Sequence, residues 1–219
     1  MKNKSKYILP AASFVLFVIL IVLIKTVDVA YTGVGNTKIG LYGLNSAAFK
    51  FFGTNTAWYR ITELTGLLSI AIGGVFALLG VWQLIKRKSL FKVDTEILTL
   101  GGLYVLTGII YVFFEKIIIN YRPVIMEGET VPEASFPSSH TVLAVVIAGS
   151  AFMLLNKYVK NKTVLYILKS LCAALAVVTV IGRLLAGVHW LTDILGGIIL
   201  SVCLLSLFGA FIKEKKADA

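Results

Sequence analysis

Long apolar stretches alternate with short polar segments along the whole 219-residue chain. A stretch of about 20 apolar residues is long enough to cross the hydrocarbon core of a membrane as a helix. Six such stretches occur, and we expect transmembrane helices at residues 7–25, 61–85, 96–119, 141–157, 164–181 and 190–212. The pattern therefore predicts an all-α, polytopic membrane protein in which residues 1–219 form a single helical-bundle domain.

Composition agrees with this prediction, because 58% of the residues are hydrophobic, 15% are charged and the mean hydropathy is +0.90. A soluble domain is nearer half apolar and a quarter charged. The formal charge of +10 does not predict a nucleic-acid partner, because the basic residues lie in short loops between apolar runs. Cys172 and Cys203 fall inside apolar runs, where a thiol packs as a small hydrophobic group.

The amino terminus is basic and is followed at once by an apolar run, as in a signal peptide. No convincing small-residue cleavage site follows this run, and further spans come after it, so we expect an uncleaved first helix.

Basic residues are concentrated in alternate segments between the spans, which predicts the orientation in the cell membrane. We expect both termini to be cytoplasmic and loops 26–60, 120–140 and 182–189 to face outward. The basic residues that lead to this prediction are Lys2, Lys4, Lys6, Lys86, Arg87, Lys88, Lys92, Lys157, Lys160, Lys162, Lys213, Lys215 and Lys216.

The chain contains two histidines, and each lies among residues that handle phosphate. The first ends the run Pro137-Ser138-Ser139-His140, which follows Arg122-Pro123. The second belongs to Gly182-Arg183, His189 and Asp193. All three clusters fall in or beside the two outward loops 120–140 and 182–189, although the basic residues that predict the orientation lie elsewhere. This agreement predicts one site at one membrane face.

Phosphate binding requires cations and N–H donors around its oxygens. Arg122 and Arg183 supply planar guanidinium groups that match phosphate oxygens in pairs. Ser138 and Ser139 stand where the fourth span begins, so either can cap that helix, and its exposed N–H groups favour an anion. His140 then lies in the first turn, at the edge of the anion site.

A covalent mechanism is available to the second histidine. His189 and Asp193 are four residues apart and share one face if both are helical. A carboxylate bonded to one ring nitrogen fixes the tautomer and leaves the other nitrogen free to attack phosphorus. Water would then hydrolyse the phospho-histidine, with His140 acting first as the acid and then as the base. The scheme requires neither a metal nor another cofactor.

These clusters resemble the three signature motifs of the type 2 phosphatidic acid phosphatase (PAP2) superfamily in order and spacing. That family includes bacterial lipid phosphatases and soluble vanadium haloperoxidases. The resemblance implies a PAP2-like bundle and a lipid phosphatase acting on undecaprenyl pyrophosphate, phosphatidylglycerol phosphate or phosphatidate. It implies that His189 is the nucleophile, Asp193 its partner and His140 the acid and base. It further implies phosphate binding by Arg122, Ser138 and Arg183.

The chain departs from the family pattern at three positions. The motif lysine expected seven residues before the arginine is replaced by Glu115, and Lys116 comes one residue late. One helical residue turns a side chain by about 100°, so Lys116 is a displaced candidate for phosphate binding. Ser139 replaces the usual glycine, keeping its N–H group as a phosphate donor, and Gly182 replaces a common serine. We expect activity with an altered phosphate pocket.

Other functions stay open on the sequence. The phospho-histidine can pass its phosphate to an alcohol, which would make the protein a phosphotransferase. His140, His189 and Asp193 offer metal-ligating groups, although the neighbouring arginines would repel a cation. Because the motif lysine is displaced, a non-catalytic lipid-binding or transport protein with a degenerate site also stays open. In loop 26–60, apolar residues at helical spacing predict either an interfacial amphipathic helix or a packed cap.

Overall fold

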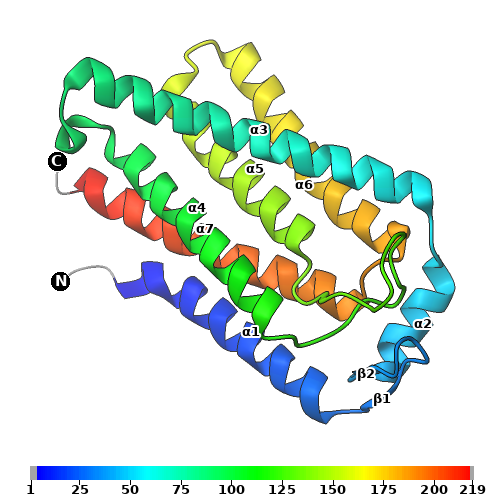
Figure 1. The fold of residues 1–219 in the computed structure, drawn as a ribbon. Coiled ribbons are helices and arrows are strands. Elements are labelled where there is room, and N and C mark those ends of the chain that lie inside the picture. Colours follow the sequence, from blue (N-terminus) through cyan, green and yellow to red (C-terminus); the bar gives the residue numbers. More distant parts are fainter. Residues whose placement is uncertain (1–3, 218–219) are drawn as a thin grey trace.

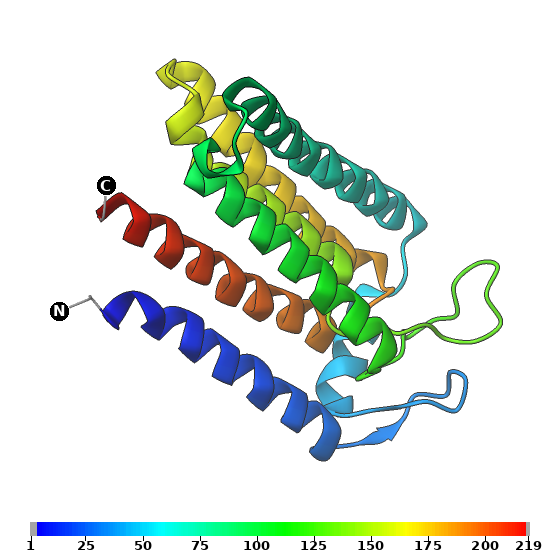
Figure 2. The ribbon, with the colours of Figure 1, turned by 60° about the vertical axis from the view of Figure 1, so that its left-hand side comes forward.

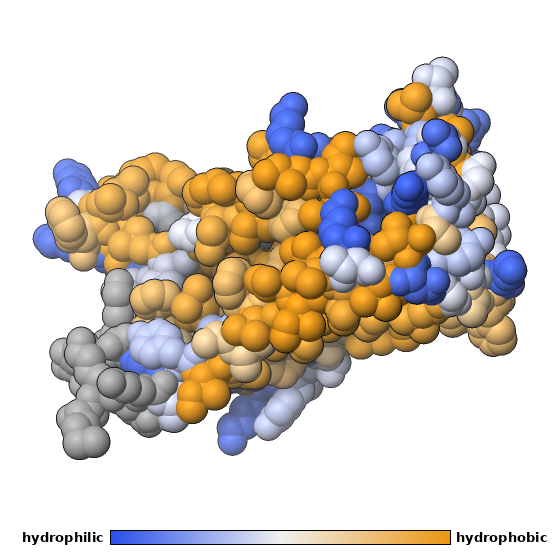
Figure 3. Space-filling view, turned by 90° about the horizontal axis from the view of Figure 1, so that it is seen from below, coloured by the Kyte–Doolittle hydropathy of each residue, from blue (hydrophilic) through white to orange (hydrophobic). Residues whose placement is uncertain are grey.

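The computed structural model describes residues 4–217, in which six long helices run side by side (Figures 1 and 2). Each of the six is long and apolar enough to cross a membrane, as predicted. The spanning helices are α1 (Ile8–Thr26), α3 (Thr56–Arg87), α4 (Thr95–Lys116), α5 (Ser139–Tyr158), α6 (Lys162–Ala186) and α7 (Leu191–Ala217). Apolar side chains cover much of the middle of the face seen in Figure 3, with polar residues gathered mainly towards the ends.

The helices are held by one apolar core, with α5 at its centre. Helix α5 packs against α3, α6 and α7, while α1 packs against α7. Side chains such as Val146, Leu200 and Phe208 are almost fully buried in this core. Helices α3 and α4 share fewer contacts, and the space between them matters for the site.

Two short connections lie at the end of the bundle that also carries both termini (Figure 1). One contains the 3-10 helix η2 (Leu90–Lys92), and the other joins α5 to α6. A further 3-10 helix, η1 (Lys4–Tyr7), precedes α1. Lys2, used above to predict orientation, lies outside the described residues, as do the side chains of Lys4, Lys213, Lys215 and Lys216.

An ionic network fastens the α3–α4 connection to the end of α5. Asp94 accepts hydrogen bonds from Arg87 at 2.8 Å and Tyr158 at 3.0 Å, and it lies 3.2 Å from Lys157. Burial alone would raise the pKa of Asp94, but these partners and Gln83 more than offset it and lower the pKa to about 2. The network holds α3, α4 and α5 together at this end.

Loop 26–60 folds at the opposite end into a two-stranded hairpin, β1 (Ala30–Tyr31) and β2 (Lys38–Ile39), followed by α2 (Tyr42–Phe52). The side-chain oxygen of buried Asn45 accepts hydrogen bonds from the amide and hydroxyl of Thr192 in α7. The predicted helix exists, and this bond makes it a packed cap on α7. Phe51 on α2 is 82% exposed, so the same helix also presents an apolar side chain outward.

Candidate active site

The predicted residues meet where three connections converge at the end of the bundle carrying α2. His140 lies in the first turn of α5, Arg183 in the last turn of α6, and Arg122 in the loop between α4 and α5. His189 lies in the short connection between α6 and α7. That connection turns sharply at Gly187, whose φ is +67° and where a Cβ would come 2.0 Å from the carbonyl oxygen of Gly53. A glycine is therefore needed to bring His189 into the site.

A cavity of about 720 Å³ opens between α3, α4 and α5. At one end its wall carries His140, His189 and Arg122, and the remaining wall is mostly apolar. The apolar lining comes from Leu67, Ile70, Ala77, Tyr104, Ile110, Phe114, Val142, Leu143, Val146 and Ile147. The cavity therefore joins a polar end to a long apolar groove.

His189 is buried against Asp193, with 3.7 Å between Nδ1 and a carboxylate oxygen. This distance exceeds a hydrogen bond. The two residues do not share a helical face, because α7 begins only at Leu191. Instead, the Asp193 carboxylate reaches back to accept a 2.9 Å hydrogen bond from the amide of Trp190, in the manner of a capping box. Helix capping therefore places the carboxylate beside the imidazole.

Asn120 holds the other oxygen of Asp193 through a 2.8 Å hydrogen bond. The Asn120 side chain is buried, and its backbone carbonyl accepts a hydrogen bond from the amide of Ser135. Burial lowers the pKa of His189 to about 4, although the Asp193 carboxylate raises it. The imidazole is therefore neutral at pH 7 and keeps a free electron pair.

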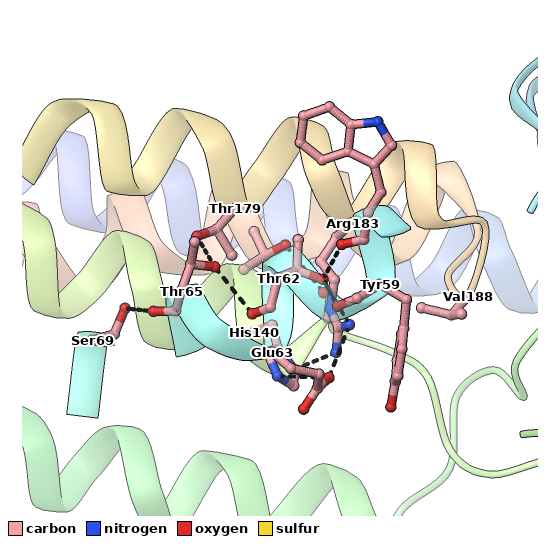
Figure 4. Close-up of polar contacts among 12 residues, drawn as sticks. Tyr59, Thr62, Glu63, Thr65, Ser69, His140, Thr179, Arg183 and Val188 are labelled. Atoms are coloured by element: carbon pink, nitrogen blue, oxygen red, sulfur yellow. Dashed lines mark hydrogen bonds and ion pairs between the residues drawn. The ribbon is translucent and has the colours of Figure 1, made fainter. Parts of the chain in front are cut away.

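A second cluster joins α3, α5 and α6 (Figure 4). Arg183 contacts Nδ1 of His140 at 2.5 Å and donates to the hydroxyl of Thr62 at 3.1 Å. One oxygen of Glu63 lies 3.2 Å from Arg183 and 3.2 Å from Nε2 of His140. The guanidinium also stands over the ring of Tyr59. Since a guanidinium can only donate, Nδ1 of His140 is an acceptor and the ring proton is on Nε2.

Arg122 completes the polar end of the cavity from the α4–α5 loop. Its Nε lies 3.0 Å from a carboxylate oxygen of Glu133, and its backbone amide donates to the Glu133 carbonyl. A terminal nitrogen makes a long, 3.4 Å contact with the carbonyl of Val188. These contacts tie Arg122 to the connection that carries His189.

Six buried side-chain atoms among residues 5–212, whose side chains the structure describes, have no hydrogen-bond partner. All six belong to residues at or beside this polar end, and such atoms are costly to leave unpaired. They are Asn120 Oδ1, Arg122 Nε, Ser135 Oγ, Arg183 Nε, and both ring nitrogens of His189. Of these, Arg122 Nε lies in ion-pair contact with Glu133 without a hydrogen bond between them. The arrangement can therefore accept a polar ligand that supplies acceptors to the arginines and an electrophilic centre to His189.

Three predicted phosphate ligands differ in position. Ser139 lines the cavity at the start of α5. Ser138 is fully buried and does not line it; its amide donates to the Asp193 carbonyl and its hydroxyl accepts from Thr141. Lys116 is exposed and is not brought to the cavity, whereas Glu115 lines it. The one-residue displacement seen in the sequence thus has the structural consequence expected from helical rotation.

Glu63, Asn120 and Ser135 belong to the site but were not identified from the sequence. Glu63 carried a signal, because a carboxylate inside a predicted membrane span is costly and marks a functional position. Asn120 and Ser135 lie in a polar loop, where nothing in the sequence distinguishes them from their neighbours. His140, His189 and Asp193, considered above as metal ligands, do not form a metal-binding group in the described part of the chain.

Comparison with known proteins places these observations in a family context. The sequence model of the PAP2 superfamily matches residues 96–216, which is more than half of the chain. No match was found among curated proteins. The fold is similar to the crystal structure of a transmembrane PAP2-type phosphatidylglycerolphosphate phosphatase from Bacillus subtilis, with a TM-score of 0.64 and 20% sequence identity. The match covers 95% of this chain and 97% of the other.

Proposed function

The chain belongs to the PAP2 superfamily, and from this membership we propose that it is an integral membrane lipid phosphatase. The reaction is removal of the terminal phosphate from a lipid phosphate or pyrophosphate. The candidates are undecaprenyl pyrophosphate, phosphatidylglycerol phosphate and phosphatidate, the second being the substrate named for the similar Bacillus protein. The observation that carries the proposal is the group of buried nitrogens without a partner on Arg183 and His189, beside the guanidinium of Arg122.

The shape of the cavity supports a lipid substrate. Its polar end carries Arg122 and the two histidines, and Arg183 contacts His140 from behind this wall. The apolar wall continues between α3 and α4 as far as Ala77 and Tyr104. Apolar area on this scale binds hydrocarbon through the hydrophobic effect. A phosphate on a prenyl or acyl chain therefore fits the cavity in one direction, with its headgroup against His189.

The mechanism follows from the positions of the two histidines. Nε2 of His189 attacks phosphorus and the bond from phosphorus to the leaving oxygen breaks. His140 gives that oxygen a proton and returns to its neutral form; it does so as the imidazolium, which requires Arg183 to have turned from Nδ1 of His140 to the phosphate. Water then attacks the phospho-histidine while His140 takes its proton. The phosphorus–nitrogen bond breaks, and inorganic phosphate leaves. Arg122, Arg183 and the first-turn amides of α5 offset the charge on the phosphoryl oxygens.

The site is proposed to face the outside of the cell, with both termini inside. Lys86, Arg87, Lys88 and Lys92 lie at the opposite end of the bundle from His189, together with the termini (Figure 1). Since basic residues favour the cytoplasmic side, this arrangement supports substrates of the outer leaflet.

Phosphate release from the three lipids by the purified protein in detergent tests the proposal, with a metal chelator present throughout. The wild type is expected to release phosphate, and His189→Ala is expected to lose this activity. Glu129→Gln, an exposed loop substitution, serves as the control. Transfer of the phosphate to an added alcohol, instead of to water, would identify a phosphotransferase. Absence of release from every lipid by folded wild-type protein would contradict the proposal.

A further inference from the structure

Glu63 is the acidic side chain that contacts both His140 and Arg183. It lies on α3, in the second turn of that helix, and reaches across to α5 and α6 (Figure 4). The same oxygen, Oε1, lies 3.2 Å from the Arg183 guanidinium and 3.2 Å from Nε2 of His140. A phosphate oxygen bound by this arginine and this histidine needs the same position.

We infer that Glu63 occupies the phosphate position in the resting enzyme and that the substrate phosphate must displace it. The inference rests on the proposed function and adds a residue that controls which anions enter. Glu63 thereby acts as an internal competitor, which a weakly bound anion cannot replace.

The burial of the two partners explains why an internal anion is needed. The Arg183 side chain is 1% exposed, and its other contacts are all uncharged: Nδ1 of His140, the Thr62 hydroxyl and the ring of Tyr59. A buried guanidinium without a counter-charge is costly. The Glu63 side chain is 42% exposed, so its carboxylate can return to water when another anion arrives. Arg183 is therefore paired both before and after the substrate binds.

The charge of an anion determines whether it can displace Glu63 from Arg183. Membrane phosphodiesters such as phosphatidylglycerol carry one negative charge, so exchanging Glu63 for such a group gains no attraction from Arg183. A terminal phosphomonoester carries between about 1.5 and 2 negative charges at pH 7 and gains attraction on exchange. Both anions must break the contact between Glu63 and Arg183 before they bind. This cost has its largest effect on the phosphodiester, because that lipid surrounds the enzyme in large excess and would otherwise fill the site. Glu63 thus keeps bulk phosphodiester lipid out of the site.

Glu63→Gln tests the inference, because it removes the charge and keeps the shape. The inhibition constants of inorganic phosphate and of phosphatidylglycerol in mixed micelles are measured for both proteins. We expect both constants to fall by about tenfold in Glu63→Gln, since a charge-assisted contact no longer has to be broken. Constants that stay unchanged or rise would overturn the inference, because a residue that merely positions Arg183 and His140 predicts weaker binding after its removal.

Two further measurements keep the test valid if the protein does not hydrolyse lipid or if Glu63→Gln does not fold. Calorimetric titration with inorganic phosphate reports displacement of Glu63 even if no lipid is hydrolysed, so failure of the proposed function does not obscure the result. If Glu63→Gln does not fold, Glu63→Asp withdraws the carboxylate by one methylene, and tighter phosphate binding by it supports the inference. Unchanged or weaker binding by Glu63→Asp then overturns it. Glu129→Gln is the matched control for removal of an acidic charge elsewhere.

Discussion

Gly66 on α3 offers a test of how closely the position of His140 is set by the bundle. A Cβ added at Gly66 would lie 2.9 Å from Cδ2 and 3.2 Å from Nε2 of His140. Carbon atoms in contact are normally about 3.5–4.0 Å apart, so Gly66→Ala must move the ring by about 0.6–1 Å. That movement pulls Nε2 away from the position in which it serves the leaving oxygen. A misplacement of about 1 Å lowers the rate by roughly 100-fold.

The same substitution has opposing effects on stability. Crowding of the ring costs about 1–3 kcal/mol, whereas alanine in place of glycine in a helix gains about 1 kcal/mol. We therefore expect kcat to fall by about 10- to 100-fold, with a loss of unfolding free energy no larger than about 2 kcal/mol. Phosphate release and thermal unfolding in the same detergent measure both quantities.

Gly102→Ala is the control for this prediction. Gly102 is exposed on α4, and a Cβ there would meet no atom within 4 Å. The control should keep wild-type activity and gain up to about 1 kcal/mol in stability. Wild-type kcat in Gly66→Ala would refute the reasoning, because it would mean that the His140 ring position is not critical.

Three other predictions concern stability. Between pH of about 6.5 and 4, His189 is protonated in the unfolded chain but not in the folded protein. The free energy of unfolding should therefore fall by up to about 3 kcal/mol as the pH is lowered through this range. Thermal unfolding measured against pH should show a smaller fall in His189→Asn. Asp94→Asn removes the negative charge that pairs with Arg87 and Lys157, and should destabilise the protein by about 1 kcal/mol at pH 7. This difference from the wild type should disappear as the pH falls from about 4 through about 2, where Asp94 is protonated in the folded protein. Gly182→Ser restores a residue common in the family but places a Cβ 2.6 Å from Thr62, so a loss of about 1–3 kcal/mol is expected in thermal unfolding.

The spanning helices could be predicted from the sequence because membrane burial requires long apolar runs, and each run is visible without tertiary information. The predicted ends of these helices were less accurate. Helix α3 begins at Thr56, five residues before the predicted span. The Asn55 side chain caps it there by accepting hydrogen bonds from the amides of Ala57 and Trp58. Helix α4 ends at Lys116, three residues early, and the following segment carries Asn120 to Asp193.

The site was only partly predictable. Motif order and membrane topology indicated that His140, Arg183 and His189 would meet, and the structure brings them to one end of the bundle. The role of Glu63 in pairing Arg183 depends on how α3 packs against α6. That packing follows from the close approach at Gly182, which no pattern within α3 reveals. The position of Asp193 was expected from helical periodicity, but it depends on capping at Trp190 and on a hydrogen bond from Asn120.

A phosphoryl group trapped on His189 would test the central claim most directly. The protein would be mixed briefly with a lipid carrying a labelled terminal phosphate, quenched in alkali, where a phosphorus–nitrogen bond survives, and analysed by mass spectrometry of its peptides. The account predicts labelled phosphate on the peptide containing His189, and none in His189→Ala. Phosphate released by the wild type at full rate without a labelled histidine would contradict it, because water would then attack the lipid directly.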